Sequence, residues 1–147
     1  MTRIKIEFEN GGAFSDKLLE AEAPRTCKKI AESLPFSYRF HQSIVSGQAI
    51  VALPPDLTVG PENQRTVGVP PGSLCFLVKD PARNVPDEIY ISYGPYFVSR
   101  CSTIDFQQPV NVFARIEYDL DRLMDVGQRI LMDGAEIVSF GLLTDDA

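Results

Sequence analysis

The feature that most constrains the fold is a short-range alternation of apolar and polar residues. Near the N-terminus, Ile4, Ile6 and Phe8 are separated by charged residues. An alternation of period two sends successive side chains to opposite faces of a β-strand, so one face of this segment is apolar. The segment ends in Asn10-Gly11, a pair that accepts the positive φ angles of a tight turn. The chain is therefore predicted to open with a β-hairpin.

Other short segments predict further strands. Residues 36–42 alternate, with aromatic side chains on one face and Ser37, Arg39 and His41 on the other. Residues 88–93 also alternate and turn Glu88 toward the polar face. Short, continuously apolar segments are typical of central strands covered on both faces. Two such segments lie at residues 49–53 and 74–78, and the last strands are expected at residues 111–118 and 136–142.

Two segments have helical periodicity instead. Pro24 suits the first turn of a helix that Pro35 ends. Its buried stripe is predicted to hold Cys27, Ile30, Ala31 and Leu34. Asp119 can cap a second helix and Gly134 can end it, although Gly127 could divide it into two pieces. The apolar face of this helix is predicted to hold Leu120, Leu123, Met124 and Leu131.

A long connection lies between the two central strands. Residues 54–72 hold five prolines and three glycines, too many for regular structure. Because an excursion of this length in a compact domain is often functional, we expect this Pro-rich loop to form a lid or a rim.

Composition excludes several classes of protein. A length of 147 residues predicts one domain over residues 1–147. No apolar run is long enough to span a membrane, and the charged N-terminus is unlike a signal peptide, which predicts a soluble, cytoplasmic protein. A net charge of −6 with scattered basic residues disfavours nucleic acid as a partner.

The histidine and cysteine counts limit the chemistry. His41 is the only histidine, so a metal site with two imidazoles and a mechanism with a second histidine are excluded. Cys27, Cys75 and Cys101 are odd in number, widely spaced and without a C-x-x-C pair. They are expected to be reduced thiols, and buried Cys75 is expected to act as a small hydrophobic residue.

The order of the elements, with a hairpin, a helix, several strands, a second helix and a final strand, matches the cyclophilin-like barrel. Ala-Pro-Arg-Thr-Cys at 23–27 resembles the start of the first cyclophilin helix, and Val-Phe-Ala-Arg-Ile at 112–116 resembles the strand before the second. The resemblance implies a mainly β fold. We expect a closed, mostly antiparallel barrel of seven or eight strands with helices near residues 24–34 and 120–132.

A closer resemblance, over nearly the whole chain, is to a bacterial family of unknown function with a cyclophilin-like fold. Its motifs stand here as Ala-Pro-Arg-Thr-Cys at 23–27, Leu-Pro-Phe at 34–36, His41 before Ser46-Gly47, Glu62-Asn63 before Pro70-Pro71-Gly72, Glu88-Ile89, Tyr93-Gly94, Phe97 with Ser99, Asn111 with Phe113, and Gly134-Ala135. Ser43, Ile44 and Gln48 stand where this family usually has an arginine, a tryptophan and a glutamate. The chemistry of this chain could therefore differ from that of its relatives.

Prolyl isomerisation is the activity that the fold name suggests, but the residues that cyclophilins use for it are missing. Phe40-His41-Gln42 keeps only the first two residues of their Phe-His-Arg segment, and their Gln-Gly-Gly-Asp-Phe motif is absent. Because a fold does not imply a function, isomerase activity is the least favoured hypothesis.

His41 is the strongest single candidate for a functional residue. It lies on the predicted polar face beside Arg39, where a neighbouring charge could tune a titrating imidazole. A hydrogen-bonding surface histidine is the alternative interpretation, and the family resemblance favours the functional one.

Further polar residues flank the apolar strands or the Pro-rich loop. A carboxylate such as Glu62 or Glu88 beside a histidine can serve acid–base chemistry or hold a polar ligand. For Glu88 and Asn111, hydrogen bonds at strand edges or turns are the alternative. Tyr93 belongs to an aromatic cluster that could line a pocket or pack in the core. We expect His41, Glu88 and Asn111 to share one cleft, with the loop and Glu62 closing over it.

The leading hypothesis is a module that binds a small polar metabolite in a cleft on the barrel, with no cofactor and no metal. The predicted ligand-binding residues are His41, Arg39, Glu62, Glu88, Tyr93 and Asn111. The alternative is an enzyme: an amide-bond hydrolase or the accessory subunit of one, by analogy with the cyclophilin-like barrels of allophanate hydrolases. Assembly into a homo-oligomer stays open.

Overall fold

The computed structural model describes residues 2–101 and 104–143. Its strands are β1 (Arg3–Phe8), β2 (Ala13–Leu18), β3 (Phe36–Gln42), β4 (Gly47–Ala52), β5 (Ser73–Leu77), β6 (Glu88–Phe97), β7 (Arg100–Cys101), β8 (Ile104–Gln107), β9 (Asn111–Ile116) and β10 (Glu136–Leu143). Its helices are α1 (Pro24–Ser33), the short 3-10 helix η1 (Pro81–Arg83) and α2 (Leu120–Asp133).

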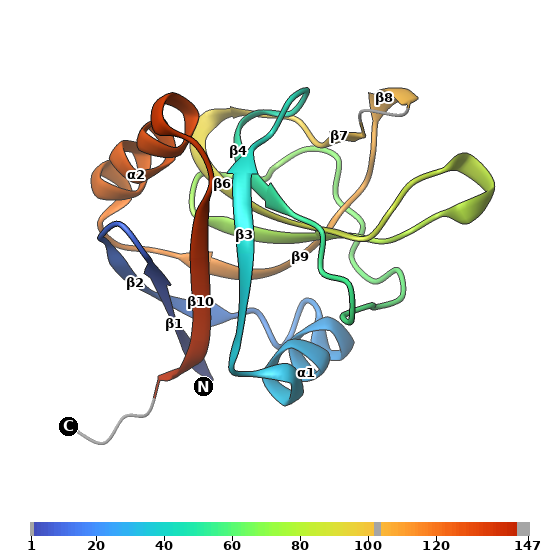
Figure 1. Ribbon diagram of the computed structural model, residues 1–147. Helices are drawn as coiled ribbons and strands as arrows, with labels where there is room; N and C mark the ends of the chain where they lie inside the picture. The colour runs from blue at the N-terminus through green and yellow to red at the C-terminus, as the bar shows by residue number, and fades with distance from the viewer. Residues whose placement is uncertain (1, 102–103, 144–147) are drawn as a thin grey trace.

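Eight of these strands close into a barrel in the order β1-β10-β3-β4-β6-β5-β9-β2 (Figure 1). Every neighbouring pair in the barrel is antiparallel. Strands β7 and β8 pair separately as a two-stranded sheet. The predicted closed antiparallel barrel with two α-helices is therefore confirmed.

The predicted N-terminal hairpin is formed by β1 and β2. Ile4, Ile6 and Phe8 are buried, whereas Lys5 and Glu7 between them are exposed. The turn uses Gly11 and Gly12 with φ angles of 113° and 109°, a region that residues with a Cβ seldom adopt. The hairpin thus follows from period-two patterning and from turn residues that tolerate positive φ.

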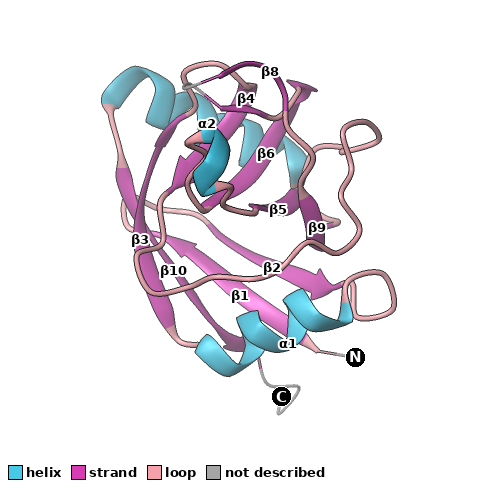
Figure 2. Ribbon diagram, turned by 90° about the vertical axis from the view of Figure 1, so that its right-hand side faces the viewer, coloured by secondary structure: helices cyan, strands magenta, loops and turns pink. Residues whose placement is uncertain are grey.

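The barrel interior is one apolar core. The two helices lie at opposite ends of the barrel, as Figures 1 and 2 show. Cys27 and Ile30 of α1 belong to this core, together with Leu123 and Ile130 of α2. Each helix therefore buries one stripe of side chains against the inward-facing residues of the strands.

The buried faces of the helices differ in part from those predicted. Ala31 is exposed, as are Leu120 at 36% and Leu131 at 53%. The buried face of α2 is instead Leu123, Val126, Gly127 and Ile130, which keeps the helical spacing but is rotated from the predicted face. Gly127 does not divide α2: a Cβ there would overlap the ring of Tyr93, so glycine permits close packing of the helix on the barrel.

A second apolar cluster lies on the outer face of the barrel over β4, β5, β6 and β9. Along β5, Leu74 and Phe76 belong to the inner core, whereas Cys75 and Leu77 belong to the outer cluster. Val69 of the Pro-rich loop and Phe97 pack against the outer cluster. This explains why the central strands are continuously apolar: both of their faces are covered.

The side chains of two cysteines are described, and both Cys27 and Cys75 are buried free thiols. Burial raises the pKa of each thiol to about 12. The side chain of Cys101 lies outside the described residues. In the described part of the chain, no helix has the length and apolar character that crossing a membrane requires.

Candidate functional site

A cleft with a volume of about 150 Å³ lies on the outer face of the barrel, over β3, β4 and β6. Its lining residues are His41, Ser43, Ile44, Val45, Val51, Leu53, Pro86, Glu88, Tyr90 and Arg100. His41 on β3 pairs with Val51 on β4, which pairs with Tyr90 on β6. Because Glu88 lies two residues from Tyr90 on the same face of β6, the sheet register brings His41 and Glu88 into one cleft.

Glu88 provides a largely buried carboxyl group in this cleft, with 9% of the residue exposed. Burial raises its pKa, while the nearby Tyr90 hydroxyl and the charge of His41 act in the opposite direction. The ionised carboxylate is therefore less favourable here than in water, and a cation that entered the cleft would stabilise it.

His41 is exposed, and one of its ring nitrogens already has a partner. Nδ1 lies 3.0 Å from the carbonyl oxygen of Gln42. Since a carbonyl can only accept a hydrogen bond, this contact places a proton on Nδ1 and leaves Nε2 as an acceptor in the neutral ring. In the neutral imidazole this contact favours the tautomer with the proton on Nδ1.

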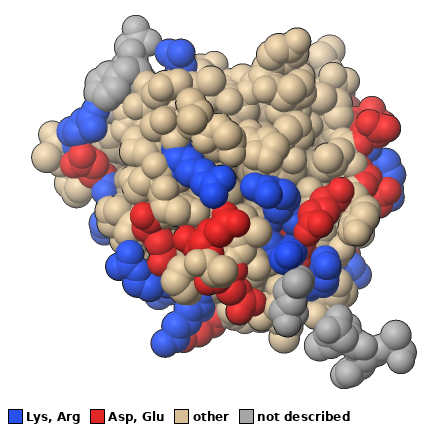
Figure 3. All heavy atoms as spheres, turned by 180° about the vertical axis from the view of Figure 1, so that it is seen from behind, with Lys and Arg blue, Asp and Glu red and all other residues tan. Residues whose placement is uncertain are grey.

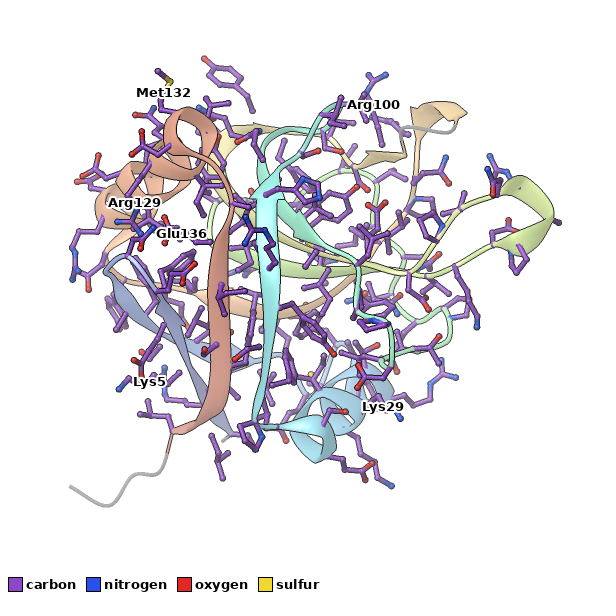
Figure 4. The ribbon with its side chains drawn as sticks, in the orientation of Figure 1. Lys5, Lys29, Arg100, Arg129, Met132 and Glu136 are labelled. Carbon is purple, nitrogen blue, oxygen red and sulfur yellow. The ribbon has the colours of Figure 1, made fainter. Side chains whose placement is uncertain are left out.

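Arg100 is a lining residue that sequence reasoning missed. Its backbone N–H donates to Oγ of Ser46 at 2.9 Å, and the Ser46 hydroxyl donates to the Arg100 carbonyl at 3.1 Å. The hydroxyl of Tyr90 donates to the same carbonyl at 3.0 Å. Figure 4 shows Arg100 beside the tip of the turn between β3 and β4. Arg100 belongs to a strand of two residues, which is too short to show an alternation in the sequence. The motif Ser46-Gly47 was the one sequence signal near this contact.

The mouth of the cleft carries three apolar side chains that are unusually exposed. Ile44 is 81% exposed, Leu53 55% and Val45 40%. Leu53 was predicted to extend the central strand, but β4 ends at Ala52 and Leu53 turns outward. The cleft therefore combines a few polar groups with an apolar rim, the usual composition of a small-molecule site.

Asn111 does not share this cleft, contrary to expectation. It pairs with Phe76 of the inner core, separated from β6 by β5, and is fully buried. Its side-chain oxygen accepts hydrogen bonds from the backbone of Glu62 and from Gln64, each at 2.8 Å, and its nitrogen donates to the carbonyl of Gly60 at 2.9 Å. Asn111 thus anchors the Pro-rich loop to β9.

Glu62 is likewise turned away from the cleft. Its carboxylate accepts hydrogen bonds from the backbone N–H groups of Arg25 and Thr26 in the first turn of α1, at 3.0 and 2.9 Å. Asn63 extends the attachment, since it exchanges hydrogen bonds of 2.9 Å with both backbone groups of Val112. The Pro-rich loop therefore covers the α1 end of the barrel and the beginning of β9, and the expected lid over His41 is wrong.

Two further predicted residues do not line the cleft. Tyr93 is 2% exposed in the inner core, and its hydroxyl donates to Gln42 at 2.6 Å. Arg39 is exposed on the same face of β3 as His41 but is not among the lining residues. Of the six predicted residues, the cleft thus unites His41 and Glu88.

The face opposite to that of Figure 1 carries charges of both signs. Figure 3 shows the face opposite to Figure 1, where basic and acidic side chains alternate over the lower half and the upper half is largely uncharged. Within the described residues, no group of three histidine, cysteine, aspartate or glutamate side chains could hold a metal ion.

The fold of this chain is similar to those of several solved structures. The described fold is similar to that of McbB in complex with tryptophan, with a TM-score of 0.71 and 18% sequence identity. That match covers 98% of this chain but 45% of McbB, so the chain spans about half the length of that protein.

Two further structures are similar over almost their full length. The hypothetical protein AF2241 from Archaeoglobus fulgidus has a TM-score of 0.59 at 23% identity, with 97% of this chain and 95% of that chain covered. The Mimivirus cyclophilin has a TM-score of 0.57 at 14% identity, with 98% and 90% covered. At such identities these likenesses show the fold alone, which is cyclophilin-like as predicted.

The family assignment comes from the sequence. No curated protein matches the chain. The sequence pattern of the family described as "Protein of unknown function (DUF3830)" matches residues 7–142. The predicted membership of a family of unknown function is confirmed, and the chain belongs to the DUF3830 family.

Proposed function

We propose that the cleft formed by β3, β4, β6 and Arg100 binds a small polar metabolite. The observation that carries this proposal is the meeting of His41 and Glu88, which are far apart in the sequence, in one cleft with Arg100. A volume of about 150 Å³ is large enough for a ligand with a single ring. McbB, whose fold is similar, has been solved with tryptophan bound, which supports small-molecule binding on this architecture.

An enzyme is the second candidate, and one observation favours it. Glu88 has a pKa raised by burial and lies near the imidazole of His41. A carboxyl group and an imidazole in one cleft are a common acid–base pair, as an amide-bond hydrolase or its accessory subunit would need. Both candidates use the same cleft. They differ in whether the protein converts the ligand into a product.

A metabolite panel screened by thermal shift tests the binding proposal. A ligand at about 100 times its dissociation constant adds about 2.7 kcal/mol to the free energy of unfolding. We expect His41→Ala to abolish the ligand-induced shift while costing about 0.5 kcal/mol or less in the free protein, because His41 is exposed. Ser37→Ala, an exposed position on the same face of β3, is the matched control and keeps the shift.

The fate of the ligand separates the two candidates. After incubation, mass spectrometry should recover an unchanged metabolite if the protein is a binding module and a cleaved one if it is a hydrolase. A panel in which no compound shifts the melting temperature of the wild type, or in which His41→Ala retains every shift, contradicts the proposed site.

A further inference from the structure

Three features of the cleft have no matching ion pair or apolar cover among the described residues. The first is Arg100, whose guanidinium group has five N–H donors. Arg25, Arg65 and Arg129 each pair with a carboxylate at 2.6 to 3.1 Å, whereas Arg100 makes no such ion pair in the described part of the chain. Its backbone is nevertheless fixed by Ser46 and Tyr90, and the residue lines the cleft.

The second feature is Glu88. Its carboxyl group is largely removed from water yet faces the cleft, and no ion pair within 4.0 Å compensates it among the described residues. Tyr90 and the charge of His41 offset the burial of this carboxyl group only in part, so a positively charged group that pairs with it directly would stabilise the carboxylate further.

The third feature is the apolar rim. Ile44 and Val45 come from the turn after β3, and Leu53 comes from the end of β4. These three side chains line one cleft although they come from two segments of the chain. An apolar body that covered them would remove their surface from water, which is a favourable change.

We propose that the ligand is a free amino acid with an apolar side chain, whose carboxylate binds Arg100, whose ammonium group binds Glu88 and whose side chain covers Ile44, Val45 and Leu53. This inference rests on the proposed function of the cleft and specifies its ligand class. One such molecule supplies the anion, the cation and the apolar surface that the three features lack. A peptide terminus carries only one of the two charges next to its side chain, so it does not satisfy both Arg100 and Glu88.

The chain provides its own reporter for the test. Because His41 is the only histidine, its imidazole proton resonances in untagged protein are identified without assignment. His41 lines the cleft, so a bound ligand changes these resonances and their concentration dependence gives an affinity.

Leucine and three analogues delete one recognition group at a time. Isocaproate lacks the ammonium group, isoamylamine lacks the carboxylate, and glycine lacks the apolar side chain. We expect each analogue to bind at least about tenfold more weakly than leucine, the effect of losing one charge-assisted contact or one buried aliphatic side chain. Phenylalanine serves as a second, larger apolar amino acid.

Two variants locate each charge. In Arg100→Gln, leucine and isoamylamine should bind with similar affinity, because the carboxylate has lost its partner. In Glu88→Gln, leucine and isocaproate should bind with similar affinity, because the ammonium group of leucine has lost its partner. Lys29→Gln removes an exposed charge on α1, remote from Arg100 in Figure 4, and should retain every difference seen in the wild type.

The outcomes separate this inference from the proposed function. If isocaproate or isoamylamine binds as tightly as leucine, or if both variants keep the wild-type preferences, the ligand class is wrong. If leucine and phenylalanine leave the His41 resonances unchanged while other metabolites shift them, the cleft is a ligand site for a different class. If no compound in a broad panel shifts them, the proposed function fails as well.

Discussion

The carboxylate of Glu62 accepts hydrogen bonds from both the backbone N–H and the hydroxyl group of Thr26, each at 2.9 Å. Thr26 lies in the first turn of α1, where N–H groups have no partner within the helix. The N-cap residue, Ala23, has no polar side chain, so Glu62 supplies the missing cap from the distant Pro-rich loop. The same contact fixes the loop to the α1 end of the barrel.

Replacing Glu62 by alanine should lower the free energy of unfolding by about 1 kcal/mol, because the first turn of α1 loses its acceptor. Burial alone would raise the pKa of Glu62, but the hydrogen bonds from Thr26 and Arg25 outweigh it and lower the pKa. A carboxyl group with a lowered folded-state pKa stabilises above its ordinary pKa and loses this effect as the pH falls. Urea unfolding should therefore show a difference at neutral pH that narrows below about pH 4. Glu32→Ala, at an exposed position of α1, is the control and should change stability by less than about 0.5 kcal/mol.

Replacing Asn111 by alanine should cost about 2 to 3 kcal/mol of stability, because the loop N–H of Glu62 and the carbonyl of Gly60 lose their buried partner. The cleft lies on the other side of β5, so ligand binding at His41 should persist. Urea unfolding measures the first effect and the His41 resonances measure the second. Loss of ligand binding with unchanged stability would instead show that Asn111 contributes to the ligand site.

Asp16 on β2 is fully buried, and neither carboxylate oxygen has a hydrogen-bond partner in the described structure. Burial raises its pKa well above the ordinary value, and the nearby backbone of Ile4 and charge of Arg3 offset this only in part. Because the folded protein holds this proton more tightly than the unfolded chain, stability falls as the pH rises from the ordinary pKa through the raised one.

Asp16→Asn removes this ionisation while keeping the shape of the side chain. The variant should match the wild type near pH 4 and exceed it by about 1 kcal/mol or more near pH 8, as urea unfolding across this range would show. Asp125→Asn, at an exposed position of α2, should follow the wild-type profile. Parallel profiles for Asp16→Asn and the wild type would show that Asp16 ionises freely in the folded protein.

Gly127→Ala should destabilise the protein by about 1 to 3 kcal/mol, because the added Cβ overlaps the ring of Tyr93 in a packed core. The intrinsic preference of alanine for helices acts in the opposite direction by about 1 kcal/mol, so a net loss reports the packing contact. Gly141→Ala, where no atom lies within 4 Å of the added Cβ, should be close to neutral. A thermal unfolding midpoint for Gly127→Ala at or above that of the wild type would refute this contact.

A protease-coupled peptide assay should detect no prolyl isomerisation above the uncatalysed rate. Phe40 is fully buried, so the Phe40-His41 pair presents only His41 at the surface. Gln42 replaces the arginine that cyclophilins use, and its amide is engaged by Gly47 and Tyr93. A cyclophilin measured under the same conditions provides the positive control, and a comparable rate would contradict this expectation.

The strands were predictable because their pattern is local. Ile4, Ile6 and Phe8 face the core for the same reason that Arg39 and His41 face outward: successive residues of a strand alternate between its faces. The proline at 24 and the glycine at 134 marked helix ends through their own backbone preferences. The face of α2 was less predictable, since Leu123 and Leu131 are equally apolar and only packing against the barrel decides which is buried.

The sequence by itself thus determined the barrel, the helices and the polar faces that carry His41 and Glu88, because these depend on side-chain periodicity and family motifs. Only the tertiary structure decided which polar residues meet. His41 reaches Glu88 through the pairing of β3 with β4 and of β4 with β6, whereas Asn111 is separated from them by β5 and points to the interior. Strand order and register depend on contacts between segments that are distant in the sequence, so a local sequence pattern does not predict them.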